Sequence, residues 1–166
     1  MRWLPDGALS FSYCLFGDIA RIRIPADKPH DRHDGLWEHT CFEAFVAVAS
    51  ETDYLEFNFS PSGQWAAYAF SAYRQTAPNP VQLEPPDIST RHSEGRLEIT
   101  ATLSPETLPK NWNHACLLVG LNAVIESADT LDGSHSYWAL HHPVERPDFH
   151  HRSGFVLTLP PPSHQF

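Results

Sequence analysis

The sequence predicts an all-β protein, a two-layer antiparallel β-sandwich of the immunoglobulin-like or jelly-roll-like kind. Runs in which polar and apolar residues alternate dominate the chain, and a period of two is typical of strands with one buried face. The 15 prolines and 8 glycines among 166 residues suit many short strands and loops. The sequence shows no long amphipathic helix and no internal repeat, so two packed sheets are the expected architecture.

The expected elements of the first half follow in order along the chain. Alternation predicts strands over residues 9–15 and 19–24, with a polar loop over 26–35 after them. Strands over 37–48 and 54–60 come next. Pro61-Ser62-Gly63 is a tight-turn signal that joins the second of them to a strand over 64–73 as a hairpin.

The second half begins with an extended, proline-rich loop over 75–86. Residues 96–103 form the cleanest alternating run of the sequence. After it, Ser104-Pro105-Glu106-Thr107 predicts one short helical turn, with serine as the cap and proline at the first position. The nearly all-apolar run 115–125 predicts a central strand, and 155–159 the last strand, which three prolines end.

Length and composition favour one globular domain over residues 1–166, with enough chain to bury a core. Hydrophobic residues make up 42% of the sequence, which excludes a disordered chain. The formal net charge is −9, with 20 acidic residues against 11 Lys and Arg, so we expect no nucleic-acid partner.

The N-terminal residues and the cysteines favour a reduced, cytoplasmic protein. No export signal is present at the start and no apolar run approaches membrane-spanning length, so we expect no membrane association. A secreted protein trimmed of its signal would begin in the same way. Cys14, Cys41 and Cys116 lie in apolar runs without paired spacing, which predicts small buried hydrophobic side chains.

The strands over 37–48 and 54–60 combine an apolar face with a polar one. In the second strand Leu55, Phe57 and Phe59 point to the core, which leaves Glu56 and Asn58 on the other face. In the first strand Trp37 and Glu43 are separated by an even number of residues, so a regular strand places both on the polar face. Antiparallel sheets commonly keep one wet face, and these residues equally fit a solvated surface.

An indole, carboxylates and an amide on a rigid sheet are the residue types that sugar recognition uses. Indole rings stack on the apolar C–H faces of a pyranose, while carboxylates and amides bridge its hydroxyl groups. Trp37 and the distant Trp138 are the candidate stacking residues, with Glu43 and Asn58 as hydrogen-bonding partners. The alternative is that both tryptophans anchor the core or the loops.

Two catalytic alternatives start from the carboxylates and the histidines. Glu43 and Glu56 on neighbouring strands would resemble the acid pair of a glycosidase, although the more common role of such pairs is solvation or ligand binding. Histidines cluster at 30, 33 and 39 and at 141, 142, 150 and 151, which suggests a metal site. Neighbouring histidines on a strand point to opposite faces, however, so local hydrogen bonding is the favoured interpretation and no metal ligands are assigned. Signatures of phosphate loops, zinc proteases and serine hydrolases are missing.

Three stretches resemble the DOMON-like superfamily, and within it carbohydrate-binding module family 9. They are Gly35-Leu36-Trp37 with Cys41-Phe42-Glu43-Ala44-Phe45-Val46, then Tyr54-Leu55-Glu56-Phe57-Asn58-Phe59-Ser60-Pro61-Ser62-Gly63, and finally Tyr137-Trp138 with Asp148-Phe149-His150 and Ser153-Gly154-Phe155-Val156-Leu157. The resemblance implies a β-sandwich in which two tryptophans, here Trp37 and Trp138, enclose a terminal sugar. It also implies that Glu43 and Asn58 bind the hydroxyl groups of that sugar.

The sequence departs from the family pattern at several of its polar positions. Asn122 begins the run that often reads Asn-x-x-Arg in the family, but Ile125 replaces the arginine. Glu56 stands where the sugar-binding members favour a basic residue, and His135 stands in place of an amide. These exchanges remove positive donors and add a carboxylate, so they change the sign of the pocket's charge. Relatives also carry structural calcium, for which residues 31–34 are the candidate loop, and other DOMON-like domains bind haem.

The leading hypothesis is therefore a non-catalytic module that binds a small molecule or oligosaccharide through Trp37, Glu43, Glu56, Asn58, Asn122, His135 and Trp138. The second hypothesis is an interaction or scaffold domain that has lost the sugar site and binds a protein partner. The third is a metal- or haem-dependent protein built on the histidines.

Overall fold

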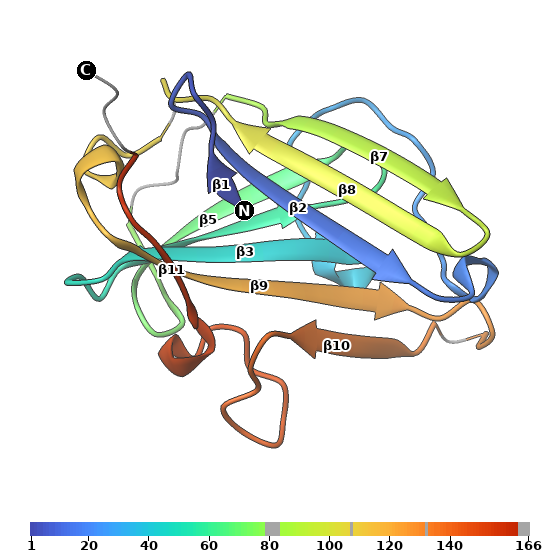
Figure 1. Ribbon diagram of the computed structural model, residues 1–166. Coiled ribbons are helices and arrows are strands. Elements are labelled where there is room, and N and C mark those ends of the chain that lie inside the picture. The colour runs from blue at the N-terminus through green and yellow to red at the C-terminus, as the bar shows by residue number, and fades with distance from the viewer. Residues whose placement is uncertain (79–83, 107, 132, 163–166) are drawn as a thin grey trace.

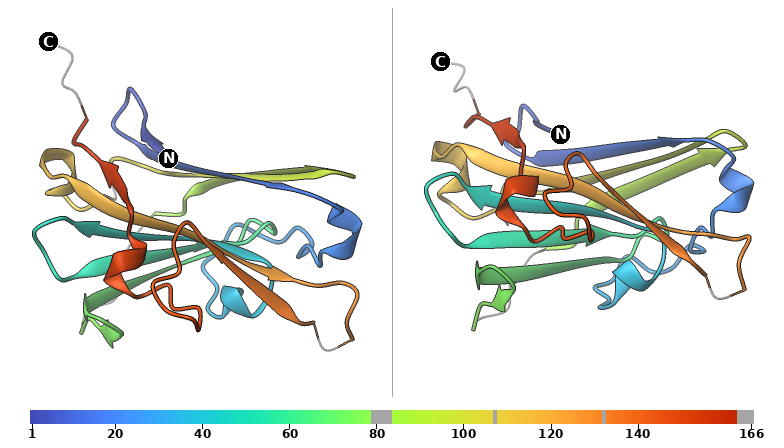
Figure 2. Two further views of the ribbon diagram at one scale, coloured as in Figure 1. Left: turned by 60° about the horizontal axis from the view of Figure 1, so that its bottom comes forward. Right: turned by 90° about the horizontal axis from the view of Figure 1, so that it is seen from below.

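The computed structural model describes residues 1–78, 84–106, 108–131 and 133–162, which form two antiparallel sheets packed as layers (Figures 1 and 2). The smaller sheet has the strand order β1 (Arg2–Trp3), β2 (Leu9–Phe16), β8 (Arg96–Leu103) and β7 (Asp87–Ser93). The larger sheet has the order β10 (His135–Ala139), β9 (Leu117–Glu126), β3 (Cys41–Val48), β4 (Tyr54–Phe59), β5 (Trp65–Ala72) and β6 (Gln75–Thr76), and β11 (Leu157–Leu159) also pairs with β9. The predicted antiparallel β-sandwich is confirmed.

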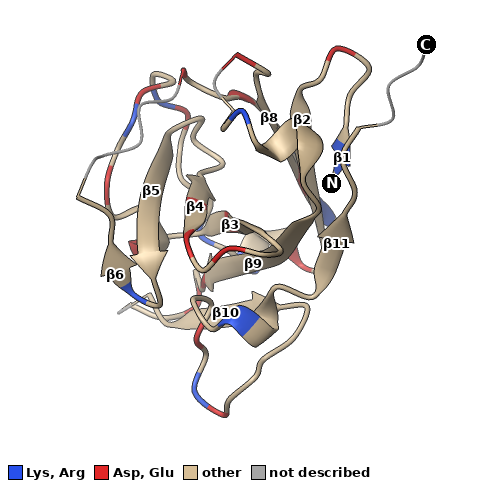
Figure 3. Ribbon diagram, turned by 90° about the vertical axis from the view of Figure 1, so that its left-hand side faces the viewer, with Lys and Arg blue, Asp and Glu red and all other residues tan. Residues whose placement is uncertain are grey.

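Helical structure within the described ranges is limited to four short 3₁₀ turns: η1 (Ile19–Arg21), η2 (Leu36–Glu38), η3 (Trp112–His114) and η4 (Arg152–Gly154). None of these helices is long and apolar enough to cross a membrane. Lys and Arg are scattered over the described ribbon rather than gathered on one face (Figure 3).

The core lies between the layers and is built from every second residue of the facing strands. On β8, every second residue is buried: Leu97, Ile99, Ala101 and Leu103. The residues that alternate with them are partly or fully exposed. A cluster of phenylalanines joins the layers: the Phe11 ring of the smaller sheet lies 6.3 Å from Phe57 and 5.9 Å from Phe59 of the larger sheet. Phe57 and Phe59 are themselves stacked, with ring centroids 6.3 Å apart. Alternation therefore gives β3 and β4 one face for the core and leaves the other face for a site.

The strand predicted over residues 19–24 is wrong. The Ile19 N–H donates to the Glu94 carbonyl and the Ile22 N–H donates back to the Ile19 carbonyl, which closes the 3₁₀ turn η1. Ile22 forms an isolated antiparallel bridge to Ser127, outside the strands of the described structure.

The strand predicted from residue 37 begins later, at Cys41. Gly35 adopts a positive φ of 78° and starts the 3₁₀ turn η2, so Trp37 lies in a helical turn rather than on a strand. Strands β1, β6, β7 and β10 were not predicted, and β6 lies inside the expected loop over 75–86, of which 79–83 fall outside the described residues. The predicted turn after Ser104 shows no helix as far as Glu106, and Thr107 lies outside the described residues.

The expectation that all three cysteines are buried is wrong for two of them. Cys41 is buried, whereas Cys14 and Cys116 are exposed, and all three are free thiols. Cys14 lies between the core-facing Tyr13 and Leu15, so alternation directs it outward, where the Arg96 Nε donates to its Sγ at 3.1 Å.

Replacing Phe57 by alanine is expected to lower the free energy of unfolding by about 3–5 kcal/mol, because it opens a cavity among the rings that join the layers. Phe57 is fully buried, whereas Phe16 is 73% exposed, so Phe16→Ala is the matched control and should change stability by less than about 0.5 kcal/mol. Urea denaturation of both variants measures the difference. Similar losses from the two variants would contradict this description of the core.

Candidate functional site

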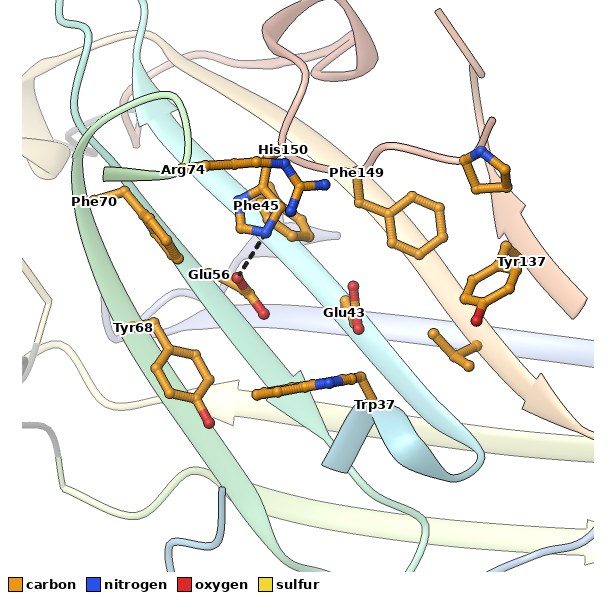
Figure 4. Close-up of a pocket in the computed structure, with 12 residues that line it drawn as sticks. Trp37, Glu43, Phe45, Glu56, Tyr68, Phe70, Arg74, Tyr137, Phe149 and His150 are labelled. Carbon is orange, nitrogen blue, oxygen red and sulfur yellow. Dashed lines mark ion pairs between the residues drawn. The ribbon is translucent and has the colours of Figure 1, made fainter. Parts of the chain in front are cut away.

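A cavity of about 410 Å³ opens on the face of the larger sheet that points away from the core (Figure 4). Strands β3, β4 and β5 form its floor, while η2, β10 and the segment between β10 and β11 form its walls. Aromatic side chains surround it: Trp37, Phe45, Tyr68, Phe70, Tyr137 and Phe149. Its polar lining residues are Glu43, Glu56, Arg74 and His150.

Strand register brings the two carboxyl groups together. Glu43 of β3 pairs with Asn58 of β4 on one side and with Asn122 of β9 on the other. Glu56 lies two residues before Asn58 on β4, where it pairs with Phe45 of β3 and with Tyr68 of β5. Because residues two apart on a strand share a face, both glutamates point into the cavity, as Figure 4 shows.

Glu43 is buried without a partner. It is only 4% exposed, and its carboxyl group makes no hydrogen bond or ion pair within the part of the chain that the structure describes. Burial raises the pKa of Glu43 well above its usual value, and the charge of Glu56 acts in the same direction. The environment therefore favours a protonated carboxyl group that can both donate and accept a hydrogen bond.

Glu56 is also buried, at 6% exposure, but it has neighbours. The Asn58 Nδ2 donates to its Oε1 at 2.9 Å, and the His150 Nε2 lies 3.7 Å from its Oε2. Burial raises the pKa of Glu56 to about 7, against the opposing effects of Asn58 and the Arg74 charge. Burial also lowers the pKa of His150 to about 4, so the contact joins a neutral imidazole N–H to the carboxyl group rather than two opposite charges.

A network of hydrogen bonds holds His150 and Arg74 against the sheet. The Tyr54 hydroxyl accepts the Arg74 backbone N–H at 3.1 Å and lies 2.9 Å from the His150 Nδ1, to which it can donate its own proton. Arg74 has a positive φ of 55°, and its Nη2 donates to Asp148 at 2.8 Å. The Tyr73 hydroxyl donates to the same carboxylate at 2.6 Å. These contacts fasten the segment between β10 and β11 over the edge of the cavity.

Trp37 forms the opposite wall and keeps much of its ring free. It is 43% exposed, and its ring meets Tyr68 edge-on at a centroid distance of 5.8 Å. Figure 4 shows Trp37, Tyr68, Phe149 and Tyr137 arranged around the two carboxyl groups. The arrangement offers flat apolar surfaces around a hydrogen-bonding floor.

The structure brings together three of the sequence-predicted site residues, Trp37, Glu43 and Glu56. Asn58 and Asn122 pair with Glu43 from the two neighbouring strands. Both are buried, but neither lines the cavity. Asn58 instead orients Glu56, and its Oδ1 has no hydrogen-bond partner in the described structure. Contributions of the two asparagines to ligand binding stay a prediction.

The expected placement of His135 is wrong. The His135 Nε2 contacts the Glu38 carbonyl at 2.9 Å, and the residue lines a separate hollow beside Glu126. It therefore lies on the same strand as Tyr137 but outside the cavity.

The predicted convergence of Trp37 and Trp138 is also wrong. Tyr137 pairs with Val124, which lines the cavity, whereas Trp138 pairs with Ala123, which packs in the core cluster. Since consecutive strand residues point to opposite faces, Trp138 lies on the other side of β10, in a hollow at the open edge of the sandwich. The two-indole sandwich is therefore absent from the described structure, and Tyr137 occupies the cavity in place of Trp138.

Sequence reasoning missed several lining residues. Tyr68 and Phe70 could have been found, because the Pro61-Ser62-Gly63 turn pairs Phe59 with Trp65 and so places Tyr68 opposite Glu56. Phe45 and Val124 lie on predicted strands and were also missed. The other missed residues come from an unpredicted strand or from connecting segments, for which the sequence carried no placement signal: Arg74, Tyr137, Pro147, Phe149 and His150.

The structure gives the metal hypotheses no ligand set. No three His, Cys, Asp or Glu side chains among the described residues are grouped so that they could hold a metal ion. In the candidate calcium loop, the Asp31 carboxylate accepts from Gln64 at 2.9 Å, and Asp34 accepts from the Tyr68 hydroxyl at 2.7 Å. Arg32 also pairs with Asp34, at 3.0 Å. These carboxylates accept hydrogen bonds from N–H and O–H donors, and they do not fit a calcium site.

The raised pKa of Glu56 predicts a pH-dependent stability. In the unfolded chain this carboxyl loses its proton near pH 4.5, whereas the folded protein keeps it until about pH 7. Wild type should therefore lose about 2–3 kcal/mol relative to Glu56→Gln as the pH rises through this window. Urea denaturation between pH 4.5 and 8 measures it, and Glu98→Gln, at a partly exposed position of the smaller sheet, is the charge-matched control. A constant difference between wild type and Glu56→Gln across these pH values would contradict the prediction.

Comparison with known proteins adds a fold likeness. No protein-family model matches the sequence, and no curated protein is similar to it. Among solved structures, the chain is similar to a 2.70 Å crystal structure of "a putative carbohydrate-binding protein" from Bacteroides uniformis ATCC 8492, with a TM-score of 0.60. The comparison covers 92% of this chain and 72% of that chain. Sequence identity is 16%, so the likeness shows a shared fold alone.

Proposed function

We propose that residues 1–166 form one non-catalytic β-sandwich module that binds a carbohydrate in the cavity of the larger sheet. The observation that carries the proposal is the ring of aromatic side chains around two buried carboxyl groups. The cavity volume of about 410 Å³ lies within the range of small-molecule sites, roughly 300–1,000 Å³.

The chemistry of the lining suits a sugar ring. Trp37 and Tyr137, which are 43% and 48% exposed, present free aromatic surface on which the C–H faces of a pyranose can stack. Glu43 and Glu56 lie on the floor of the same cavity with hydrogen-bonding capacity to spare. A bound ligand with several hydroxyl groups would supply hydrogen-bond partners to these carboxyl groups, whose burial is otherwise costly.

The fold likeness supports the same proposal. The structural neighbour is described as "a putative carbohydrate-binding protein", a name that refers to binding rather than to catalysis. We further propose that the chain is a distant member of the DOMON-like superfamily related to carbohydrate-binding module family 9. In this member Tyr137 would take the stacking role expected of Trp138.

A second candidate function is a protein-interaction domain, because Trp138 does not face Trp37. Trp138 is 62% exposed beside the exposed Phe16 and Leu140, and together they border an apolar hollow at the edge of the sandwich. Strand β1 pairs with β2 only as far as Ser10, so the rest of β2 lies at a sheet edge.

Titration with mono- and disaccharides, followed by tryptophan fluorescence, tests the carbohydrate proposal, because stacking perturbs indole emission. We expect Trp37→Ala to weaken binding by about five- to twelvefold, since it removes stacking worth roughly 1–1.5 kcal/mol. Calorimetry measures the affinity of the variant, which lacks the reporter ring.

Trp138→Ala is the matched control and should leave the affinity unchanged, because Trp138 lies on the other face of β10. If no sugar at millimolar concentration alters the emission, the carbohydrate proposal is wrong. Loss of binding in Trp138→Ala but not in Trp37→Ala would place the site elsewhere.

A further inference from the structure

We propose that the sugar bound in this cavity carries a protonated amine, and that Glu43 and Glu56 receive its ammonium group. The assignment of an amino sugar rests on the proposed carbohydrate function. It names the ligand class of the same cavity from the charges that line it.

Once ionised, the two carboxyl groups of the cavity have no cation of their own among the described residues. Glu43, Glu56 and Arg74 are its acidic and basic lining residues. The Arg74 guanidinium already pairs with Asp148 at 2.8 Å, so its charge is compensated outside the carboxyl pair. His150 shares a hydrogen bond with Tyr54, and its burial favours the neutral ring. Within the described residues, the two glutamates are left without a cation dedicated to them.

The unpartnered carboxyl group of Glu43 is an independent indication that the cavity binds a ligand. The residue is more than nine-tenths buried, and its carboxyl group is directed into the cavity and has no hydrogen-bond partner among the described residues. A buried polar group in this condition is costly unless a bound molecule supplies the missing partner. An ammonium group carries three N–H donors and a positive charge, and it can therefore donate hydrogen bonds to Glu43 and Glu56 at the same time.

The aromatic walls favour the same charge. The negative faces of Trp and Tyr rings attract cations, with contributions of about 0.5–2 kcal/mol depending on exposure. Trp37, Tyr68 and Tyr137 are arranged around the two carboxyl groups in Figure 4. Burial raises the pKa of both carboxyls, and an ammonium group beside them would lower it, so they lose their protons as the amine binds.

The test compares sugars that differ only in one group. Glucose, galactose and mannose are titrated by calorimetry at pH 7 beside their 2-amino derivatives and the corresponding N-acetyl derivatives, which are neutral. We expect at least one amino sugar to bind about tenfold more tightly than its parent, while its N-acetyl derivative shows no such gain. Glucuronic acid, which carries the opposite charge, should bind more weakly than glucose.

Two variants locate the effect. Glu43→Gln keeps the shape of the side chain and should reduce the advantage of the amine to less than about threefold. Glu98→Gln removes the same charge from the smaller sheet and should preserve the full advantage. The wild-type comparison of amine with parent sugar decides the proposal even if Glu43→Gln fails to fold.

The outcomes separate the two proposals. If neutral sugars bind and no amino sugar binds more tightly than its parent, the amino-sugar assignment is overturned while the carbohydrate function stands. Tighter binding of glucuronic acid than of glucose has the same consequence. If no sugar of any charge binds, both proposals are overturned together.

Discussion

The site depends on two carboxyl groups that are buried on the outer face of a β-sheet. Polar residues at such positions usually meet water, since an antiparallel sheet commonly keeps one wet face. Here η2 and the segment between β10 and β11 cover that face, so that Glu43 and Glu56 are almost fully buried. Burial sets their protonation, and their unmet hydrogen-bonding capacity makes the cavity a place for a ligand.

The same strands build the core and the site. Phe57 and Phe59 of β4 pack against the smaller sheet, while Glu56 between neighbouring core positions points into the cavity. The core packing of these strands therefore also holds the floor of the site rigid. Its rim is held differently, by long-range contacts such as the Arg74–Asp148 ion pair, which joins the β5–β6 turn to the segment after β10. A rigid floor with a fastened rim holds the aromatic walls in place around the carboxyl groups.

Local pattern was enough to predict the floor but not the walls. Residues 96–103 match β8 over its whole length, and the alternation of residues 54–60 correctly put Glu56 on the face opposite the core. Trp138 was misplaced because β10 is a short strand at the sheet edge with little burial, so its sequence shows no clear alternation. Trp37 was taken for a strand residue because the turn that Gly35 starts leaves no mark in the periodicity. The positions of Arg74 and His150 follow from tertiary contacts that no local pattern encodes.

Burial keeps Glu43 and Glu56 protonated well above the usual pH range of a carboxyl group. Titration of the side-chain carboxyl carbons by ¹³C NMR, assigned with the two single Glu→Gln variants, measures this protonation. The structure predicts a midpoint near pH 7 for Glu56 and one well above the usual carboxyl range for Glu43. Midpoints near 4.5 for both groups would show that water or an unrecognised cation reaches them, and that result would contradict the account.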